Sequence, residues 1–225
     1  MSFPILLAAD CSEYPPEDLV ARYVPGGLLE YLEEHPEAPA KAMLWSRLIL
    51  STVPTMVEPV IGKTFDYEED FTLSPKLRGN IFSYCNIEER DGMIAITLSE
   101  LPISVSLRRM NLLKYERDEI RRSFPSTYRA WVDRQENPIQ AFYQLWTAEA
   151  VIYKKIIPLL SLKISDEDLL DVSYPSIYLK ESLLFWQYED WMFSVVGKMI
   201  IPLLTEYRSP EKTIALLRAM SAGQI

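Results

Sequence analysis

Two short clusters of carboxylates are the residues whose spacing could support metal chemistry. One is DYEED at residues 66–70, and the other is DEDLLD at residues 166–171. Several carboxylate oxygens in one turn could bind a magnesium ion, which prefers oxygen ligands. A structural explanation competes with this, because Ser165 and Asp168 match a capping box and acids near a helix start interact favourably with its dipole. We favour that explanation and predict no metal site and no cofactor.

Catalytic motifs are scarce in the rest of the sequence. The single histidine, His35, stands at a predicted helix end before Pro36, where a solvated side chain is the simplest interpretation. One histidine cannot supply the multi-histidine ligand sets of most transition-metal sites. No GxxxxGK[ST], GxGxxG or GxSxG motif occurs, and the seven glycines leave little material for phosphate-binding loops. The sequence therefore names no catalytic residue and favours a non-enzymatic protein.

Basic side chains concentrate between residues 108 and 134. This segment holds seven of the thirteen arginines together with Lys114. On a helix, Asp118 is four residues from both Lys114 and Arg122, which is the spacing of ordinary surface ion pairs. Part of the cluster is therefore expected to be paired within its own helix.

Arg117 has no acidic residue at such a spacing, and it shares one helical stripe with Lys114 and Arg121. A guanidinium group in this position requires an anion from elsewhere. The anion is either the first third of the chain, where residues 1–75 carry a net charge of −9, or a phosphate or acidic partner. Lys114, Arg117 and Arg121 are therefore predicted partner-binding residues.

Aromatic side chains gather between residues 174 and 193, where seven of them occur. On the helix predicted for residues 178–200 they spread around the whole circumference, which favours core packing. Tyrosine and tryptophan also carry polar groups that seek a hydrogen-bond partner or water, so a protein interface remains an alternative interpretation. Trp186 and Trp191 complete the predicted partner-binding set.

A second function from a different class remains open. In it the chain is a helical enzyme or ligand carrier whose apolar pocket is lined by Trp146, Tyr153, Trp186 and Trp191, with magnesium at residues 66–70. Such a pocket would lie between two duplicated helices. Their duplication is suggested by VIYKKIIPLL at residues 151–160 and VVGKMIIPLL at 195–204, which share seven of ten letters.

The elements that must position these residues read as mainly helical. Residues 80–98 contain two β-prone runs around Asp91-Gly92, a turn pair that tolerates positive φ, so one small β-hairpin is predicted there. From about residue 106 onward the pattern predicts helices, including 138–157 and 178–200. We therefore predict a mainly α protein, a multi-helix bundle with one hairpin.

This bundle is expected to be a single mainly helical domain over residues 1–225. Charge suggests a possible subdivision into an acidic part, 1–105, that contains the hairpin and a helical core, 106–225. A composition with 48% hydrophobic residues supplies enough apolar side chains for a packed core.

Composition also limits the class of partner. The formal charge of −9 argues against nucleic acid, because neutralising phosphates requires an excess of lysine and arginine. Cys11 and Cys85 are too few for a disulfide framework, which indicates a reducing, cytoplasmic setting. No uncharged run is long enough to span a membrane. We predict a non-enzymatic interaction or regulatory protein that binds another protein, and its oligomeric state stays open.

Overall fold

The computed structural model describes residues 4–55, 65–78, 81–154, 160–173, 181–198 and 203–224. The chain divides into two compact units. Unit 1 combines residues 1–101 with residues 202–225, and unit 2 consists of residues 102–201. In the part of the chain that the structure describes, no helix has the length and apolar composition needed to cross a membrane.

Unit 1 is built on a four-stranded sheet with the order β11-β1-β5-β4. Its strands are β1 (Ile5–Asp10), β4 (Tyr84–Arg90), β5 (Met93–Ser99) and β11 (Leu204–Tyr207). β1 pairs antiparallel with β5 and parallel with β11, so the last strand of the chain joins the first. β4 and β5 form the hairpin predicted near residues 80–98, and Asp91 in its turn has a φ of 51°.

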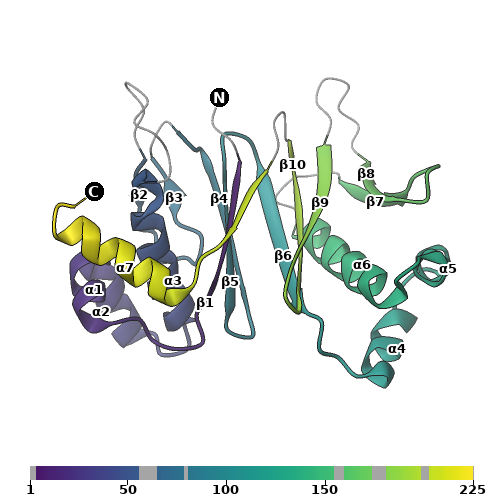
Figure 1. Ribbon diagram of the computed structural model, residues 1–225, viewed down its shortest axis with the longest axis horizontal. Helices are drawn as coiled ribbons and strands as arrows, with labels where there is room; N and C mark the ends of the chain where they lie inside the picture. The colour runs from purple at the N-terminus through teal and green to yellow at the C-terminus, as the bar shows by residue number, and fades with distance from the viewer. Residues whose placement is uncertain are drawn as a thin grey trace. The chain divides into compact units, whose positions relative to one another are not determined.

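Four helices lie on one side of this sheet (Figure 1): α1 (Glu17–Tyr23), α2 (Gly26–Glu34), α3 (Ala40–Ser51) and α7 (Pro210–Ser221). Alternate strand residues face them, because side chains of a strand point to opposite faces in turn. The core of unit 1 accordingly joins buried residues of the strands and of α3. They include Ile5, Leu7, Ile94, Ile96, Trp45, Leu48 and Ile49.

A small antiparallel pair, β2 (Tyr67–Glu68) and β3 (Lys76–Leu77), is attached to α3 through Arg47. The Arg47 side chain is fully buried and forms a bidentate ion pair with Glu69 at 2.6 and 2.8 Å. A short 3-10 helix, η1 (Val53–Thr55), follows α3.

Unit 2 contains a three-stranded antiparallel sheet with the order β6-β10-β9. Its strands are β6 (Ile103–Arg109), β9 (Glu181–Tyr188) and β10 (Trp191–Lys198), and the last two form a hairpin. A separate two-stranded pair consists of β7 (Ser161–Ile164) and β8 (Leu170–Ser173).

The helices of unit 2 are α4 (Lys114–Arg122), α5 (Ser126–Arg134) and α6 (Pro138–Tyr153). α6 begins as its sequence predicts, because the Asn137 side chain accepts a hydrogen bond from the Gln140 N–H at 3.1 Å. It packs on the sheet, where the buried Thr147 and Ser194 hydroxyl groups are hydrogen-bonded to each other.

Residues 5–99 of unit 1 and residues 103–198 of unit 2 have the same order of strands and α-helices. Each segment begins with a strand, continues with three α-helices and a short two-stranded pair, and ends with a hairpin whose second strand pairs antiparallel with the first strand. Unit 1 adds η1 after α3, and β11 and α7 after its hairpin. The turns correspond as well, because the non-glycine residues with positive φ in the described chain fall in the two short pairs and the two hairpins. They are Phe71 and Asp91 in unit 1, and Asp168 and Glu189 in unit 2.

The prediction of a mainly α, multi-helix bundle is wrong, because the structure is mixed α/β with eleven strands beside seven α-helices in its described residues. The prediction that a single domain over residues 1–225 is mainly helical is wrong for the same reason. Residues 181–198 form the β9–β10 hairpin instead of a helix.

The proposed duplication of a helical unit at residues 151–160 and 195–204 is wrong too. Val151 lies in helix α6, whereas Val195 lies in strand β10. Residues 155–159 and 199–202 lie outside the described residues.

Candidate functional site

Helices α4 and α5 are consecutive and are joined by a short turn at residues 123–125. The Glu116 side chain accepts the Leu113 N–H at 2.6 Å and so fixes the start of α4. Pro125 cannot continue a helix but suits the position before the first turn of α5. Phe124, in the turn, is buried in the core of unit 2 with Trp131 of α5. The turn is therefore held by hydrophobic packing as well as by its proline.

The two helices line an open surface groove of about 530 Å³, which we call the α4–α5 groove. Residues three, four and seven apart lie on one face of a helix. One face of each helix therefore lines the groove. α4 contributes Asp118, Arg121 and Arg122, and α5 contributes Ser126, Arg129 and Asp133.

The three arginines of the groove differ in their partners. Arg121 forms an ion pair with Asp133 of the neighbouring helix and donates to the Arg129 carbonyl at 3.2 Å. Its Nε is buried and has no acceptor in the described residues. The side chains of Arg122 and Arg129 make neither a hydrogen bond nor an ion pair within the described part of the chain. The groove therefore holds two guanidinium groups that form no ion pair with a described residue.

Ion pairs between Asp118 and either Lys114 or Arg122 were expected from their spacing on the helix. They do not form among the described residues, although Asp118 and Arg122 line the same groove.

Of the predicted basic residues, only Arg121 lines the groove. Arg117 is half-buried, and its Nη1 donates to the Leu112 carbonyl just before α4. Lys114 is exposed at the start of α4. The three basic side chains predicted to form one stripe therefore do not line one site. Arg117 donates to a backbone carbonyl of its own segment and does not require an anion from elsewhere.

The predicted aromatic residues lie on the sheet of unit 2. Trp191 begins β10 and is 5% exposed, with the Arg109 guanidinium 5.9 Å from its ring centroid. Trp186 of β9 is half-buried, with its ring centroid 4.9 Å from that of Phe193. Neither tryptophan lines the α4–α5 groove, so the structure does not join the basic and aromatic parts of the predicted site.

The alternative pocket lined by four aromatic residues depended on two duplicated helices. Trp146 does lie on α6, where its ring contacts Phe142 and Tyr143, but Tyr153 is 76% exposed at the end of that helix. Since Trp186 and Trp191 belong to a β-hairpin, the helix pair that would have enclosed the pocket is absent from the described chain.

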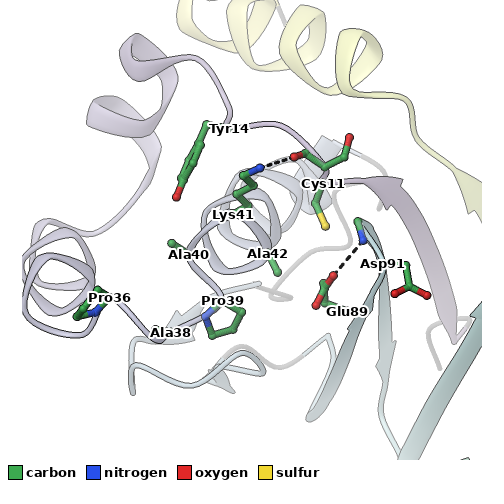
Figure 2. A pocket seen from close by; sticks show the side chains of 12 residues that line it. Cys11, Tyr14, Pro36, Ala38, Pro39, Ala40, Lys41, Ala42, Glu89 and Asp91 are labelled. Atoms are coloured by element: carbon green, nitrogen blue, oxygen red, sulfur yellow. Dashed lines mark hydrogen bonds between the residues drawn. The ribbon is translucent and has the colours of Figure 1, made fainter.

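A second pocket, of about 440 Å³, lies in unit 1 (Figure 2) between the segment after β1, the start of α3 and the β4–β5 turn. Lys41 Nζ donates to the Ser12 carbonyl at 2.5 Å and lies 5.2 Å from the Tyr14 ring centroid. Glu89 accepts the Gly92 N–H at 3.1 Å. Its lysine and its glutamate are thus engaged by neighbouring backbone groups.

Cys11 is the only thiol of this pocket. Burial raises the pKa of the Cys11 thiol to about 12, and the nearby carboxylates of Glu89 and Asp10 act in the same direction. A thiol with such a pKa is protonated at neutral pH, whereas nucleophilic attack requires the thiolate. The pocket therefore contains no activated cysteine nucleophile.

The carboxylates of residues 66–70 have structural partners. Glu68 forms an ion pair with Arg78 at 2.8 Å, Glu69 pairs with Arg47, and Asp70 accepts the Thr72 hydroxyl at 2.7 Å. The described residues contain no group of three or more histidine, cysteine, aspartate or glutamate side chains placed to hold a metal ion.

The second acidic cluster, residues 166–171, forms the turn between β7 and β8 rather than a helix start. Asp168 forms an ion pair with Arg134 of α5 at 2.5 Å and accepts a hydrogen bond from Gln135 at 3.1 Å. The hydrogen bond from Arg134 lowers the pKa of the Asp168 carboxyl group. This arginine of the basic segment is therefore occupied by the chain itself.

His35 also has a structural role. Its Nδ1 lies 2.9 Å from the Tyr31 carbonyl oxygen, and its ring stacks on that of Tyr31 with centroids 4.1 Å apart. These contacts place the single histidine at the end of α2.

Sequence reasoning identified the basic segment but not the two arginines, Arg122 and Arg129, whose side chains have no partner among the residues that the structure describes. Arg122 was assigned to Asp118, and Arg129 was not singled out. The i,i+3 spacing of Ser126 and Arg129, directly after a helix-starting proline, is the signal that could have found the second face of the groove. Searches of protein-family models and of curated protein sequences found no match to this chain.

Proposed function

We propose that this chain is a non-enzymatic interaction or regulatory protein and that it docks an anionic segment of a partner protein in the α4–α5 groove. The observation that carries this proposal is the pair of guanidinium groups, Arg122 and Arg129, that face one groove without a partner in the described residues. Arginine is favoured at protein interfaces because its planar fork binds carboxylates through two hydrogen bonds.

The rest of the groove supports a docking role over a catalytic one. Its other charged groups are Arg121, already paired with Asp133, and Asp118. None of its side chains is a cysteine or histidine that could act as nucleophile or base at neutral pH. The proposal includes a cytoplasmic location, which the two free thiols, Cys11 and Cys85, fit.

The test is the binding of a fluorescein-labelled peptide with isolated glutamates in a glycine and alanine background, followed by fluorescence anisotropy. The Arg122→Gln/Arg129→Gln variant should bind at least about tenfold more weakly, which corresponds to the loss of about 1.4 kcal/mol. The matched control is Arg78→Gln/Arg218→Gln, because it makes the same change in net charge at two exposed arginines of unit 1.

The control should stay within about twofold of the wild type, because neither arginine lines the groove and exposed charges outside it are screened by salt. Equal losses in both variants would show that bulk charge and not the groove attracts the peptide. A peptide that does not bind the wild-type protein at all would refute the docking proposal.

A further inference from the structure

We infer that the anion recognised by the α4–α5 groove is a phosphate group, carried by a phosphorylated serine or threonine of the partner protein. This inference rests on the proposed function, because that function supplies the protein partner. The groove itself supplies the argument for phosphate.

The first step concerns charge. Arg122 and Arg129 together carry two positive charges that form no ion pair with a described residue, and the carboxylate of Asp118 lies in the same groove. A glutamate side chain brings one negative charge, whereas a phosphorylated side chain brings about −1.5 to −2 and three strong acceptor oxygens at neutral pH. The three oxygens of a single phosphate can therefore accept from both guanidinium groups and still exceed the charge of Asp118, whereas the two oxygens of a single carboxylate pair bidentately with only one guanidinium group.

The second step concerns hydrogen-bond donors. Ser126 lines the groove as the first residue of α5, a helix of nine residues. The residue before it is Pro125, which has no side-chain acceptor, and the N–H groups of Ser126 and Thr127 have no acceptor in the described chain. Free N–H groups at a helix start favour an anion. Together with the Ser126 hydroxyl group, they add donors for the remaining phosphate oxygens.

The third step concerns Arg121, which lines the same groove. Its Nη2 is engaged by Asp133 and by the Arg129 carbonyl, and its Nε is buried without an acceptor in the described residues. The ion pair with Asp133 holds Arg121 against α5. This contact keeps the Arg121 side chain ordered in the lining of the groove, so binding of a phosphate there need not order it.

The fourth step concerns the form of the ligand. Asp118 and Asp133 line the same groove as the arginines. A run of adjacent anionic groups, as in a nucleic acid or a polyglutamate segment, would bring its further charges against these carboxylates. One compact dianion has no further charges to bring against these carboxylates. The net charge of −9 likewise disfavours a polyanion.

The experiment compares three fluorescein-labelled peptides that differ at one position, which holds phosphoserine, glutamate or serine in a glycine and alanine background. The phosphoserine peptide should bind the full-length protein at least about tenfold more tightly than the glutamate peptide. Its affinity should fall at least about tenfold in the Arg122→Gln/Arg129→Gln variant. In the Arg78→Gln/Arg218→Gln control its affinity should change by no more than about twofold. It should also weaken below about pH 6, where the phosphate becomes a monoanion.

Equal binding of the phosphoserine and glutamate peptides would overturn the inference and leave the proposed docking function standing. Absence of binding by either peptide would overturn both. Inorganic phosphate that competes with the same affinity as the phosphoserine peptide would overturn the protein origin of the ligand. A single-stranded oligonucleotide that competes more strongly than the phosphoserine peptide would overturn the argument from the two aspartates.

Discussion

The Arg47–Glu69 ion pair makes the sharpest prediction about stability in unit 1. All five N–H groups of the Arg47 guanidinium are used: two by Glu69, two by the carbonyls of Thr72 and Leu73, and one by the Ser46 hydroxyl. The arginine side chain is 0% exposed and the glutamate side chain 11%. This contact therefore joins α3 to the β2–β3 segment without access of water to the guanidinium.

Glu69→Gln keeps the shape of the side chain but removes the charge that neutralises Arg47. Leaving one member of a buried pair without its partner costs roughly 3–5 kcal/mol. For a chain of this size each kcal/mol lowers Tm by about 2–4 °C. The expected fall in Tm is therefore about 6–20 °C.

The assay is thermal unfolding followed by far-ultraviolet circular dichroism, with Glu68→Gln as the matched control. Glu68 pairs with Arg78, and the side chains of this pair are 41% and 59% exposed. An exposed pair contributes at most about 1 kcal/mol, so the control should lose no more than about 4 °C. A Glu69→Gln protein that melts within 4 °C of the wild type would refute the assignment of Arg47 as a buried charge that depends on Glu69.

Three further predictions concern other parts of the fold. Gly92 has a φ of +81°, and a Cβ there would come within 3.0 Å of a neighbouring side chain. Gly92→Ala should therefore lower the free energy of unfolding by roughly 1–3 kcal/mol in a urea titration, whereas Gly26→Ala, with open space around it, should change it by less than about 1 kcal/mol. Burial raises the pKa of the Cys11 and Cys85 thiols to about 12, so both are protonated at pH 8, where about a quarter of a free cysteine is ionised. The native protein should therefore react with iodoacetamide much more slowly than the unfolded protein, and equally fast labelling of the two would contradict this. The lowered pKa of Asp168 implies stabilisation that is complete above its ordinary pKa of 3.8 and is lost as the pH falls through its folded pKa. Asn tolerates the positive φ at this position, so Asp168→Asn should fold but lose less of its free energy of unfolding than the wild type when the pH is lowered, as measured by urea titration. The same dependence of this free energy on pH in both proteins would count against a stabilising role of the Asp168 carboxylate.

The two hairpins illustrate what the sequence reveals and what it conceals. In unit 1 the turn is Asp91-Gly92, a pair that adopts positive φ readily and marks a hairpin. In unit 2 the corresponding turn is Glu189-Asp190, and glutamate has no such preference although its φ is 50°. The strands beside it, β9 and β10, contain leucine, tryptophan, phenylalanine and methionine in an order that also fits a buried helix. A short apolar run cannot be assigned by periodicity alone.

The spacing of Ser165 and Asp168 correctly suggested local hydrogen bonds, but it was assigned to a helix start and belongs to a turn between two strands. The sequence predicted a capping box at a helix start. In the structure the Ser165 hydroxyl oxygen accepts the Leu169 N–H at 3.1 Å, and the Ser165 carbonyl accepts the Asp168 N–H at 3.0 Å. The same kinds of hydrogen bond close the turn between β7 and β8. Serine and aspartate favour turns as well as caps, so the pattern could not distinguish the two.

The residues of the α4–α5 groove could be predicted from the sequence only in part, for a related reason. The excess of arginine between residues 108 and 134 can be counted, but which guanidinium groups stay unpartnered depends on contacts between two helices. Asp133 of α5 forms an ion pair with Arg121 of α4, whereas Arg122 has no ion pair with Asp118 or any other described residue. Spacing within one helix gives no information about either outcome.

The pairing of β11 with β1 has a consequence for the order in which the chain folds during synthesis. Residues 102–201 form unit 2 as one continuous segment, whereas unit 1 also requires β11 and α7, which follow that segment. At about 5–20 residues per second, the ribosome needs roughly 5–20 s to add the intervening hundred residues. During that interval one edge of β1 lacks its partner strand and the α1 and α3 surfaces lack α7, so nascent unit 1 is the part that a chaperone would be expected to bind.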